Sequence, residues 1–170
     1  MSERERNALK IIRKYVWWSM GAGLIPLPLV DIVVISGVQL KMLAEISKLY
    51  GVRFQTNRGK AVAGSLLGAA FPNLAVGICV NYLDAMSGGA VVSLLKGVPL
   101  VGVAVSTQIV VFSGASAWAL GKVFIQHFES GGTFLDFNPR EVKEYFRAQF
   151  AEGRRMAAAI TKGDKAKVLA

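Results

Sequence analysis

The hydrophobic pattern is dominated by a run from Ala61 to Gly121, in which Asp84 and Lys96 are the only formally charged side chains. Two apolar blocks within it, Ala61–Leu83 and Val98–Leu120, each have roughly the twenty residues that a helix needs to cross about 30 Å of hydrocarbon. Both charges fall between the blocks, as expected for a turn. The pattern predicts a helical hairpin that is either embedded in a membrane or buried as the core of a helical protein.

The first twenty residues have the pattern of a basic amphipathic helix that ends at two tryptophans. Ala8, Ile12 and Tyr15 recur at helical spacing, whereas lysine and arginine side chains cluster elsewhere around the helix. Ser2 is placed to cap its N-terminus. Such a helix either lies on a membrane surface with its rings at headgroup level, or packs on the protein's own surface.

A break is expected within residues 21–51, because Pro26 and Pro28 cannot both lie inside a regular helix. A new helix is predicted to begin near Pro28 and to run to Tyr50. Gly51 is the natural C-terminal stop for this helix.

Asp31 would lie in the first turn of that helix. A carboxylate there accepts hydrogen bonds from unpaired backbone N–H groups and complements the helix dipole, so we expect a capping or helix-packing role. The alternative is an ion or proton path, because ionisable groups at membrane depth are costly and often functional. No second acidic residue accompanies Asp31 nearby, which favours the structural role.

The last helix is predicted at residues 138–152. Asn138 stands at its cap, Pro139 at its first position and Glu141 at the capping-box position. Beyond it, residues 154–170 are basic and rich in alanine, and we expect them to form a frayed tail.

Prolines and small residues shape the long apolar run. Pro72 interrupts its first block and Pro99 opens its second, so each block is predicted to be a bent or broken helix. Small residues let helices approach closely in lipid, and their density here favours contact with a neighbouring copy over packing within the hairpin alone. The predicted helix-packing or oligomerisation positions are Gly64, Gly68, Gly102 and Gly114.

Composition and charge point to a lipid partner. The 170-residue chain is 53% hydrophobic and only 18% charged, so its apolar surface needs lipid or another protein to cover it. Its net charge of +9 suits anionic lipid or nucleic acid, but aromatic residues beside the basic ones favour lipid, and we expect no nucleic-acid partner. The predicted lipid-interface residues are Lys10, Arg13, Lys14, Trp17, Trp18, Arg53, Arg58 and Lys60.

The distribution of basic residues also predicts topology. The loop of residues 52–60 and the segments at both ends of the chain are rich in lysine and arginine, which places them, and both termini, on the cytoplasmic side. The start of the chain is polar and lacks a cleavage site, so no cleavable signal peptide is expected.

The sequence contains no catalytic or metal-binding constellation. His127 is its only histidine and lacks a partner at metal-ligand spacing, so we expect an exposed or interfacial side chain. Cys79 is the only cysteine and lies in an apolar block, which excludes an intramolecular disulfide. We therefore expect neither an enzyme nor a bound cofactor or metal.

Three stretches, Pro26–Asp31, Leu49–Gly51 and especially Ala119–Asp136, resemble the bacterial family catalogued as domain of unknown function 697, also called YcjF-like. The resemblance covers roughly Ile12 to Phe150. It implies a membrane-associated domain in the bacterial inner or intracytoplasmic membrane, often joined to or encoded beside a small GTPase.

The chain departs from the GTPase-fused form of that family. Gly121 and Lys122 lack the upstream glycine and the following serine or threonine that a phosphate-binding loop requires. A GTPase, if it acts with this chain, is therefore a separate partner protein.

These observations predict an all-α, membrane-embedded domain over residues 1–153. Its predicted parts are a basic amphipathic helix (1–20), a proline-broken hairpin or helix (21–51), a hydrophobic hairpin (61–121) and an amphipathic helix (138–152). The favoured function is a non-enzymatic scaffold that self-associates and remodels the membrane from its cytoplasmic face. The alternatives are an anchor or effector subunit for a separate GTPase, and an oligomeric pore or transporter.

Overall fold

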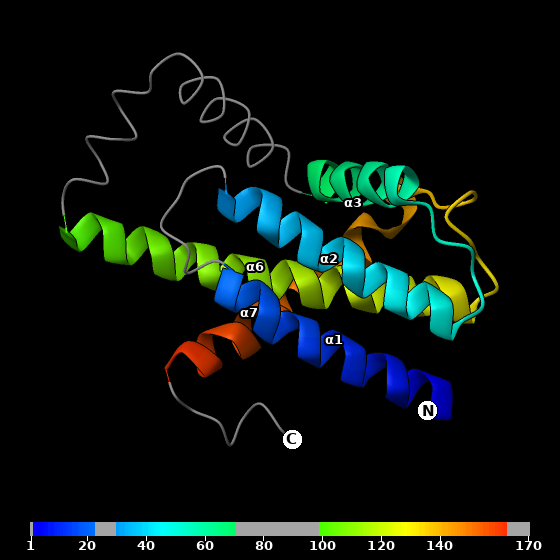
Figure 1. The fold of residues 1–170 in the computed structure, drawn as a ribbon, viewed down its shortest axis with the longest axis horizontal. Coiled ribbons are helices and arrows are strands. Elements are labelled where there is room, and N and C mark those ends of the chain that lie inside the picture. The colour runs from blue at the N-terminus through cyan, green and yellow to red at the C-terminus, as the bar shows by residue number, and fades with distance from the viewer. Residues whose placement is uncertain (1, 23–29, 71–98, 163–170) are drawn as a thin grey trace, which may run out of the picture.

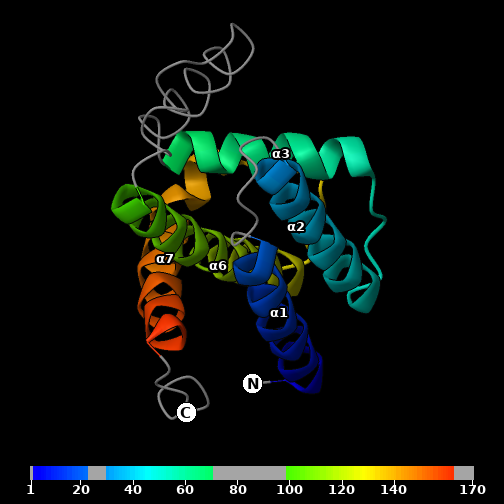
Figure 2. The same ribbon diagram turned by 60° about the vertical axis from the view of Figure 1, so that its left-hand side comes forward.

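The computed structural model describes residues 2–22, 30–70 and 99–162 (Figures 1 and 2). Every regular element in these ranges is a helix, which confirms the all-α prediction. The helices are α1 (Glu3–Ala22), α2 (Val30–Leu49), α3 (Thr56–Ala70), α6 (Pro99–Glu129) and α7 (Pro139–Thr161).

Helix α6 is the central element of the bundle. It packs most extensively against α7 and α1 and also contacts α2, while α3 lies across α7 and α2 (Figure 1). Every residue of α6 from Ser113 to Gly121 is buried. A helix that is apolar around its whole circumference must be covered on all sides, and its neighbours provide that cover.

The bundle has two distinct ends. Helices α1 and α3 run toward the end from which α2 and α6 start, on the left of Figure 1. We call this the apolar end, because α3 ends and α6 begins there, on either side of the apolar residues 71–98 of the sequence, which lie outside the described ranges. The opposite end, the loop end, is formed by the connections at residues 50–55 and 130–138 (Figure 1).

Glycines bring the outer helices onto α6 at short range. A Cβ atom at Gly121 would lie 2.5 Å from Cγ1 of Ile12 in α1, and one at Gly114 would lie 2.7 Å from Cγ of Met20, also in α1. On the other side, a Cβ at Gly153 of α7 would lie 2.8 Å from Cβ of Trp118. Helices α1 and α7 therefore sit on α6 at places where no larger side chain fits.

The predicted helix ends are largely confirmed. The Ser2 hydroxyl accepts from the Glu5 N–H (3.0 Å), and the Asn138 side chain accepts from the N–H of Arg140. Glu141 departs from the predicted capping box, because its carboxylate accepts from the side-chain amide of Asn138 (2.5 Å).

Helix α2 stops where predicted. Gly51 has a φ of 72°, a left-handed conformation that glycine adopts without steric cost. The N–H groups of Gly51 and Val52 donate to the carbonyl oxygens of Lys48 (3.2 Å) and Ser47 (2.8 Å), which together form a Schellman cap.

The proline breaks are only partly within the described ranges. Pro99 is the first residue of α6, as predicted. Helix α2 begins at Val30, two residues after the predicted start, and Asp31 falls in its first turn. Pro26, Pro28 and Pro72 lie outside the described residues, as does the turn between the apolar blocks.

The two helices extend beyond the apolar blocks of the sequence. Helix α3 begins at Thr56, before the first block, and α6 continues past the second block to Glu129. In the described part of the chain, one helical stretch, Gln108–Glu129, is long and apolar enough to cross a membrane, but 72% of an 18-residue apolar window within it is buried inside the protein. Of the two alternatives, membrane span or protein core, this stretch fits the core helix.

The predicted tail from residue 154 is also corrected, because α7 continues to Thr161. Glycine disfavours a helix interior, and Gly153 therefore suggests a helix end in the sequence. In the structure, Gly153 packs tightly against Trp118 and Ala115 of α6, and Ala157 is fully buried one turn later. This tertiary packing stabilises the helix beyond the glycine.

The glycine contacts generate a stability prediction. Gly121→Ala should lower the free energy of unfolding by about 1–3 kcal/mol, because its Cβ overlaps Ile12. Gly64→Ala should raise it by up to about 1 kcal/mol, because no atom lies within 4 Å of its Cβ and alanine favours helix. Thermal unfolding of both variants in one mild detergent checks this, and equal effects would contradict the packing described.

Candidate functional site

The family-like stretch Ala119–Asp136 forms the end of α6 and the loop that follows it. Gly131 has a φ of 80°, and the N–H groups of Gly131 and Gly132 donate to the carbonyls of Phe128 (3.0 Å) and His127 (2.9 Å). This second Schellman cap ends α6 and turns the chain back toward the core.

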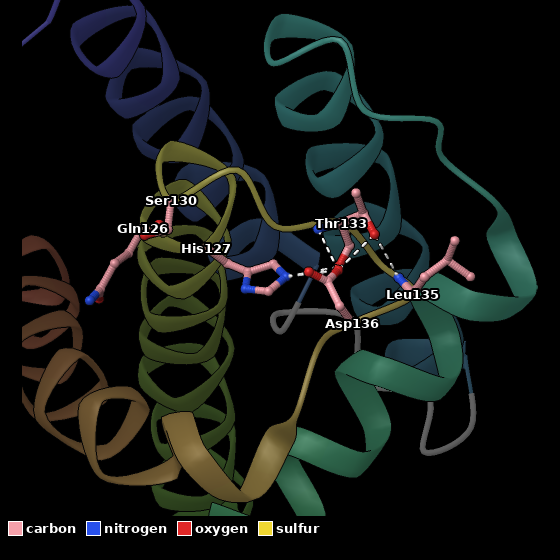
Figure 3. Close-up of polar contacts among 6 residues, drawn as sticks. All are labelled: Gln126, His127, Ser130, Thr133, Leu135 and Asp136. Atoms are coloured by element: carbon pink, nitrogen blue, oxygen red, sulfur yellow. Dashed lines mark hydrogen bonds and ion pairs between the residues drawn. The ribbon is translucent and has the colours of Figure 1, made fainter.

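Figure 3 shows His127 pointing from the last turn of α6 toward Thr133 and Asp136 in this loop. Its Nε2 atom lies 2.8 Å from the carbonyl oxygen of Thr133 and 3.7 Å from Oδ1 of Asp136. A carbonyl oxygen only accepts hydrogen bonds, so Nε2 carries the proton in this contact. The side chain of His127 is 17% exposed, so of the two predicted alternatives, exposed or interfacial, the exposed one does not hold.

Asp136 organises the same loop. Its Oδ1 atom accepts from the backbone N–H of Thr133 (2.6 Å) and from the Thr133 hydroxyl (2.7 Å). The Thr133 hydroxyl also accepts from the N–H of Leu135 (3.1 Å). The hydrogen bonds from Thr133 hold the pKa of Asp136 below its usual range.

Gly132 allows the loop to close over the histidine. A Cβ atom at this position would overlap the His127 ring. The loop backbone can therefore approach the ring only because residue 132 lacks a side chain.

An aromatic cluster lies beneath this loop and closes the core at the loop end. Phe124 stacks on Phe137, with ring centroids 4.9 Å apart and an interplanar angle of 10°. The His127 ring meets Phe137 edge-on at 5.1 Å, and Phe54 meets Phe134 edge-on at 5.5 Å. The cluster therefore joins α6, the loop after it and the connection between α2 and α3.

Beside the cluster, polar contacts of Glu129 at the end of α6 join α6 to the residue after α2 and to the residue before α1. The Tyr50 hydroxyl donates to Glu129 (2.7 Å), and the Ser2 hydroxyl lies 3.4 Å from the same carboxylate oxygen. Burial and the hydrogen bond to Glu129 raise the pKa of Tyr50, so the phenol remains neutral at physiological pH. Arg4 lies over the Tyr50 ring, 5.7 Å from its centroid.

The loop end has the chemistry of a structural cap. No group of three or more histidine, cysteine, aspartate or glutamate side chains in the described ranges could hold a metal ion. The hydroxyls nearest His127 are already engaged, since Thr133 donates to Asp136 and Ser130 donates to the carbonyl of Gln126 (3.0 Å). Sequence reasoning missed Thr133 and Asp136, although their three-residue separation after two glycines is typical of a turn closed by side chains.

The predicted lipid-interface residues fall into two separate groups. Lys10, Arg13, Lys14, Trp17 and Trp18 are exposed on α1. Trp17 is 51% exposed and Trp18 is 64% exposed. The second group lies around the start of α3, near the loop end, and consists of the exposed residues Arg53, Arg58 and Lys60.

The two tryptophans border a shallow apolar groove of about 440 Å³ between α1 and α2. Gly21, Val34 and Val38 also line it.

Lys14 has a local partner as well as an exposed position. Its Nζ atom lies 2.6 Å from Oε2 of Glu45 in α2, and the Tyr15 hydroxyl donates to Oε1 of the same residue (2.7 Å). Burial raises the pKa of Glu45, but the hydrogen bonds from Lys14 and Tyr15 outweigh it and hold that pKa below its usual range. This contact joins α1 to α2.

The predicted packing glycines have different environments. Gly114 is buried between Met20 of α1 and Ala157 of α7, so it packs within the chain. A Cβ atom placed on Gly64 or Gly68 would meet no other atom within 4 Å, so no other described residue covers the outer face of α3 at these positions. Gly102 lies in the first part of α6.

Residues 1–155 match the family described as a domain of unknown function, DUF697. This chain belongs to the DUF697 family. It is also similar to "Magnetosome membrane protein 22" of Magnetospirillum gryphiswaldense, with 32% identity over 158 residues that cover 92% of this chain and 75% of that protein. No solved structure matches the chain. The family resemblance of the Ala119–Asp136 stretch is thus confirmed.

The contacts of Asp136 predict a pH dependence of the loop. Because the folded pKa is lowered, the stabilisation from Asp136 is present above the usual aspartate pKa of about 3.9 and is lost as the pH falls through the lowered value. Thr133→Val removes the hydroxyl donor and should raise the pKa of Asp136 toward its usual value.

Carboxyl-carbon NMR of aspartate-labelled protein measures this pKa. Thr133→Ser keeps the hydroxyl and should titrate like the wild type. An ordinary Asp136 titration in the wild-type chain would contradict the loop geometry.

Proposed function

We propose that this DUF697 protein is a non-enzymatic bacterial membrane protein that self-associates into a scaffold on the cytoplasmic face of the inner or an intracytoplasmic membrane. The observation that carries the proposal is the uncovered small-residue face of α3. The similarity to a protein named for the magnetosome membrane supports a membrane location.

The sequence between α3 and α6 supports membrane insertion. Residues 71–98 contain one aspartate and one lysine among predominantly apolar side chains. Insertion of this stretch would place the apolar end of the bundle at the bilayer. The exposed Trp17 and Trp18 lie near the end of α1, which runs toward this same end (Figure 1). Tryptophan prefers the membrane interface, so both observations favour the same orientation.

The outer face of α3 supports self-association. Its inward face is formed by Gly59, Ala63, Leu66 and Ala70, all buried. On the other side, Ala61, Gly64 and Ser65 are exposed and Gly68 is partly exposed, at the three- and four-residue spacing of one helix face. Such a face lets a second helix approach closely, and the partner we propose is α3 of a neighbouring copy.

A repeated contact of this kind would generate the scaffold. Each copy would insert its apolar stretch from one leaflet, with Trp17 and Trp18 at the headgroups. Many copies joined through α3 would then add their local effects on the membrane and stabilise curvature. No step in this mechanism requires a bound cofactor or a chemical reaction.

Large side chains on the outer face of α3 test the proposal. Gly64→Leu with Gly68→Leu should reduce the assembly in mild detergent toward single chains, because leucine holds the helices apart. Ala148→Leu, at an exposed position of α7, is the matched control and should leave the assembly mass unchanged. Light scattering coupled to size exclusion measures that mass, and an unchanged mass for the α3 variant would exclude this interface.

Membrane insertion is tested separately. We expect the wild type and both variants to remain in the membrane pellet after a carbonate wash, because insertion depends on the apolar stretch rather than on α3 contacts. Release by carbonate would contradict integral insertion.

A further inference from the structure

The second half of α7 bears a basic groove that the predicted lipid-interface residues do not include. Its volume is about 670 Å³. The groove is lined by Arg147, Phe150, Ala151, Arg154, Arg155 and Ala158. It exists because α7 continues as a helix beyond Gly153, so that arginines seven and eight residues after Arg147 return to the same side.

The described residues neutralise the charges of the groove only in part. Arg147 forms an ion pair with Glu144 (3.0 Å), and its Nε atom also donates to the carbonyl oxygen of Ala70 (2.9 Å). Arg154 and Arg155 are exposed and form no ion pair or hydrogen bond with any other described residue. Two guanidinium groups are therefore available to an anionic partner.

The contact between Arg147 and Ala70 fixes where this groove lies. Ala70 is the last residue of α3, and the apolar stretch that begins at residue 71 follows it directly. On the inner side of α7, Ala157 packs at Gly114 beside Met20 in the last turns of α1. The groove thus borders the last residue of α3, after which the apolar stretch follows in the sequence, and it lies close to the last turns of α1.

The groove combines apolar and basic linings. The Phe150 ring packs against Phe112 of α6, with centroids 5.2 Å apart, and the alanines add further apolar surface. Guanidinium groups bind phosphate through paired, charge-assisted hydrogen bonds. An apolar surface beside such groups matches a phosphate joined to acyl chains better than the hydrophilic sugar-phosphate backbone of a nucleic acid.

We propose that the α7 groove binds the headgroup phosphate of an anionic phospholipid, with Arg154 and Arg155 as its ligands. This inference rests on the membrane location proposed above and adds a defined lipid site to it. The bound headgroup would fix α7 at the membrane surface and thereby set the height of the bundle above the apolar stretch.

Lipid titration of the full-length protein in neutral-detergent micelles tests the site. The probes are short-chain phosphatidylglycerol, phosphatidylcholine of the same chain length, inorganic phosphate and a single-stranded oligonucleotide. Calorimetry should detect saturable binding of phosphatidylglycerol, weaker binding of phosphatidylcholine and weakening with added salt. Arg154→Gln with Arg155→Gln should reduce the affinity for phosphatidylglycerol about thirty-fold, given the usual contribution of each basic residue at an anionic membrane surface.

A charge-matched control separates the site from overall charge. Arg140→Gln with Lys143→Gln removes the same charge from the first turns of α7 and should change the affinity less than about three-fold, because long-range electrostatics are screened. Equal losses in the two double variants would overturn the proposal, as would unchanged binding by the Arg154 and Arg155 variant. Equally tight binding of inorganic phosphate, or tighter binding of the oligonucleotide, would also overturn it.

The test is independent of the proposed scaffold. The Arg154 and Arg155 variant should remain in the carbonate-washed pellet and keep the wild-type assembly mass, because insertion and α3 contacts do not involve the groove. If the wild type is released by carbonate, the integral location fails, whereas the titration still reports on the headgroup site. Helical circular dichroism equal to that of the wild type shows that a loss of binding does not come from unfolding.

Discussion

The close approach of α1 and α7 to α6 is the constraint on which the rest of this structure depends. It is possible only where one of each facing pair of residues lacks a side chain, at Gly114, Gly121 and Gly153. The short separation lets α1 and α7, together with α2, cover the apolar surface of α6. The contacts at Gly153 also keep α7 helical beyond that residue, and the basic groove lies on this continuation of the helix.

The two ends of the bundle differ in the residues that they contain and in how the core is closed there. At the loop end, two Schellman caps, the aromatic cluster and the contacts of Asp136 close the core. The apolar end has the exposed tryptophans and flanks the long apolar stretch. The family-like stretch at the loop end therefore closes the helical core. This structural role is consistent with a family that is described as a domain of unknown function.

Local chemistry made the helices and their caps predictable, whereas burial depended on tertiary contacts. Ser2, Gly51 and Asn138 act through the few residues beside them, so the sequence indicated their roles. An apolar helix has the same pattern in lipid and in a protein core, and the sequence could not distinguish these environments for the second half of α6. The sequence did not indicate the partners of His127 and Gly153, the returning loop and Trp118, because these contacts are set by the fold.

The order of the helices along the chain has a consequence for biogenesis. Helix α6 makes its most extensive contacts with α7, which follows it in the chain, so the side of α6 that faces α7 stays uncovered until α7 has been synthesised. The apolar side of α6 that α7 covers in the folded protein is therefore exposed on the growing chain, and exposed apolar surface of this kind favours aggregation.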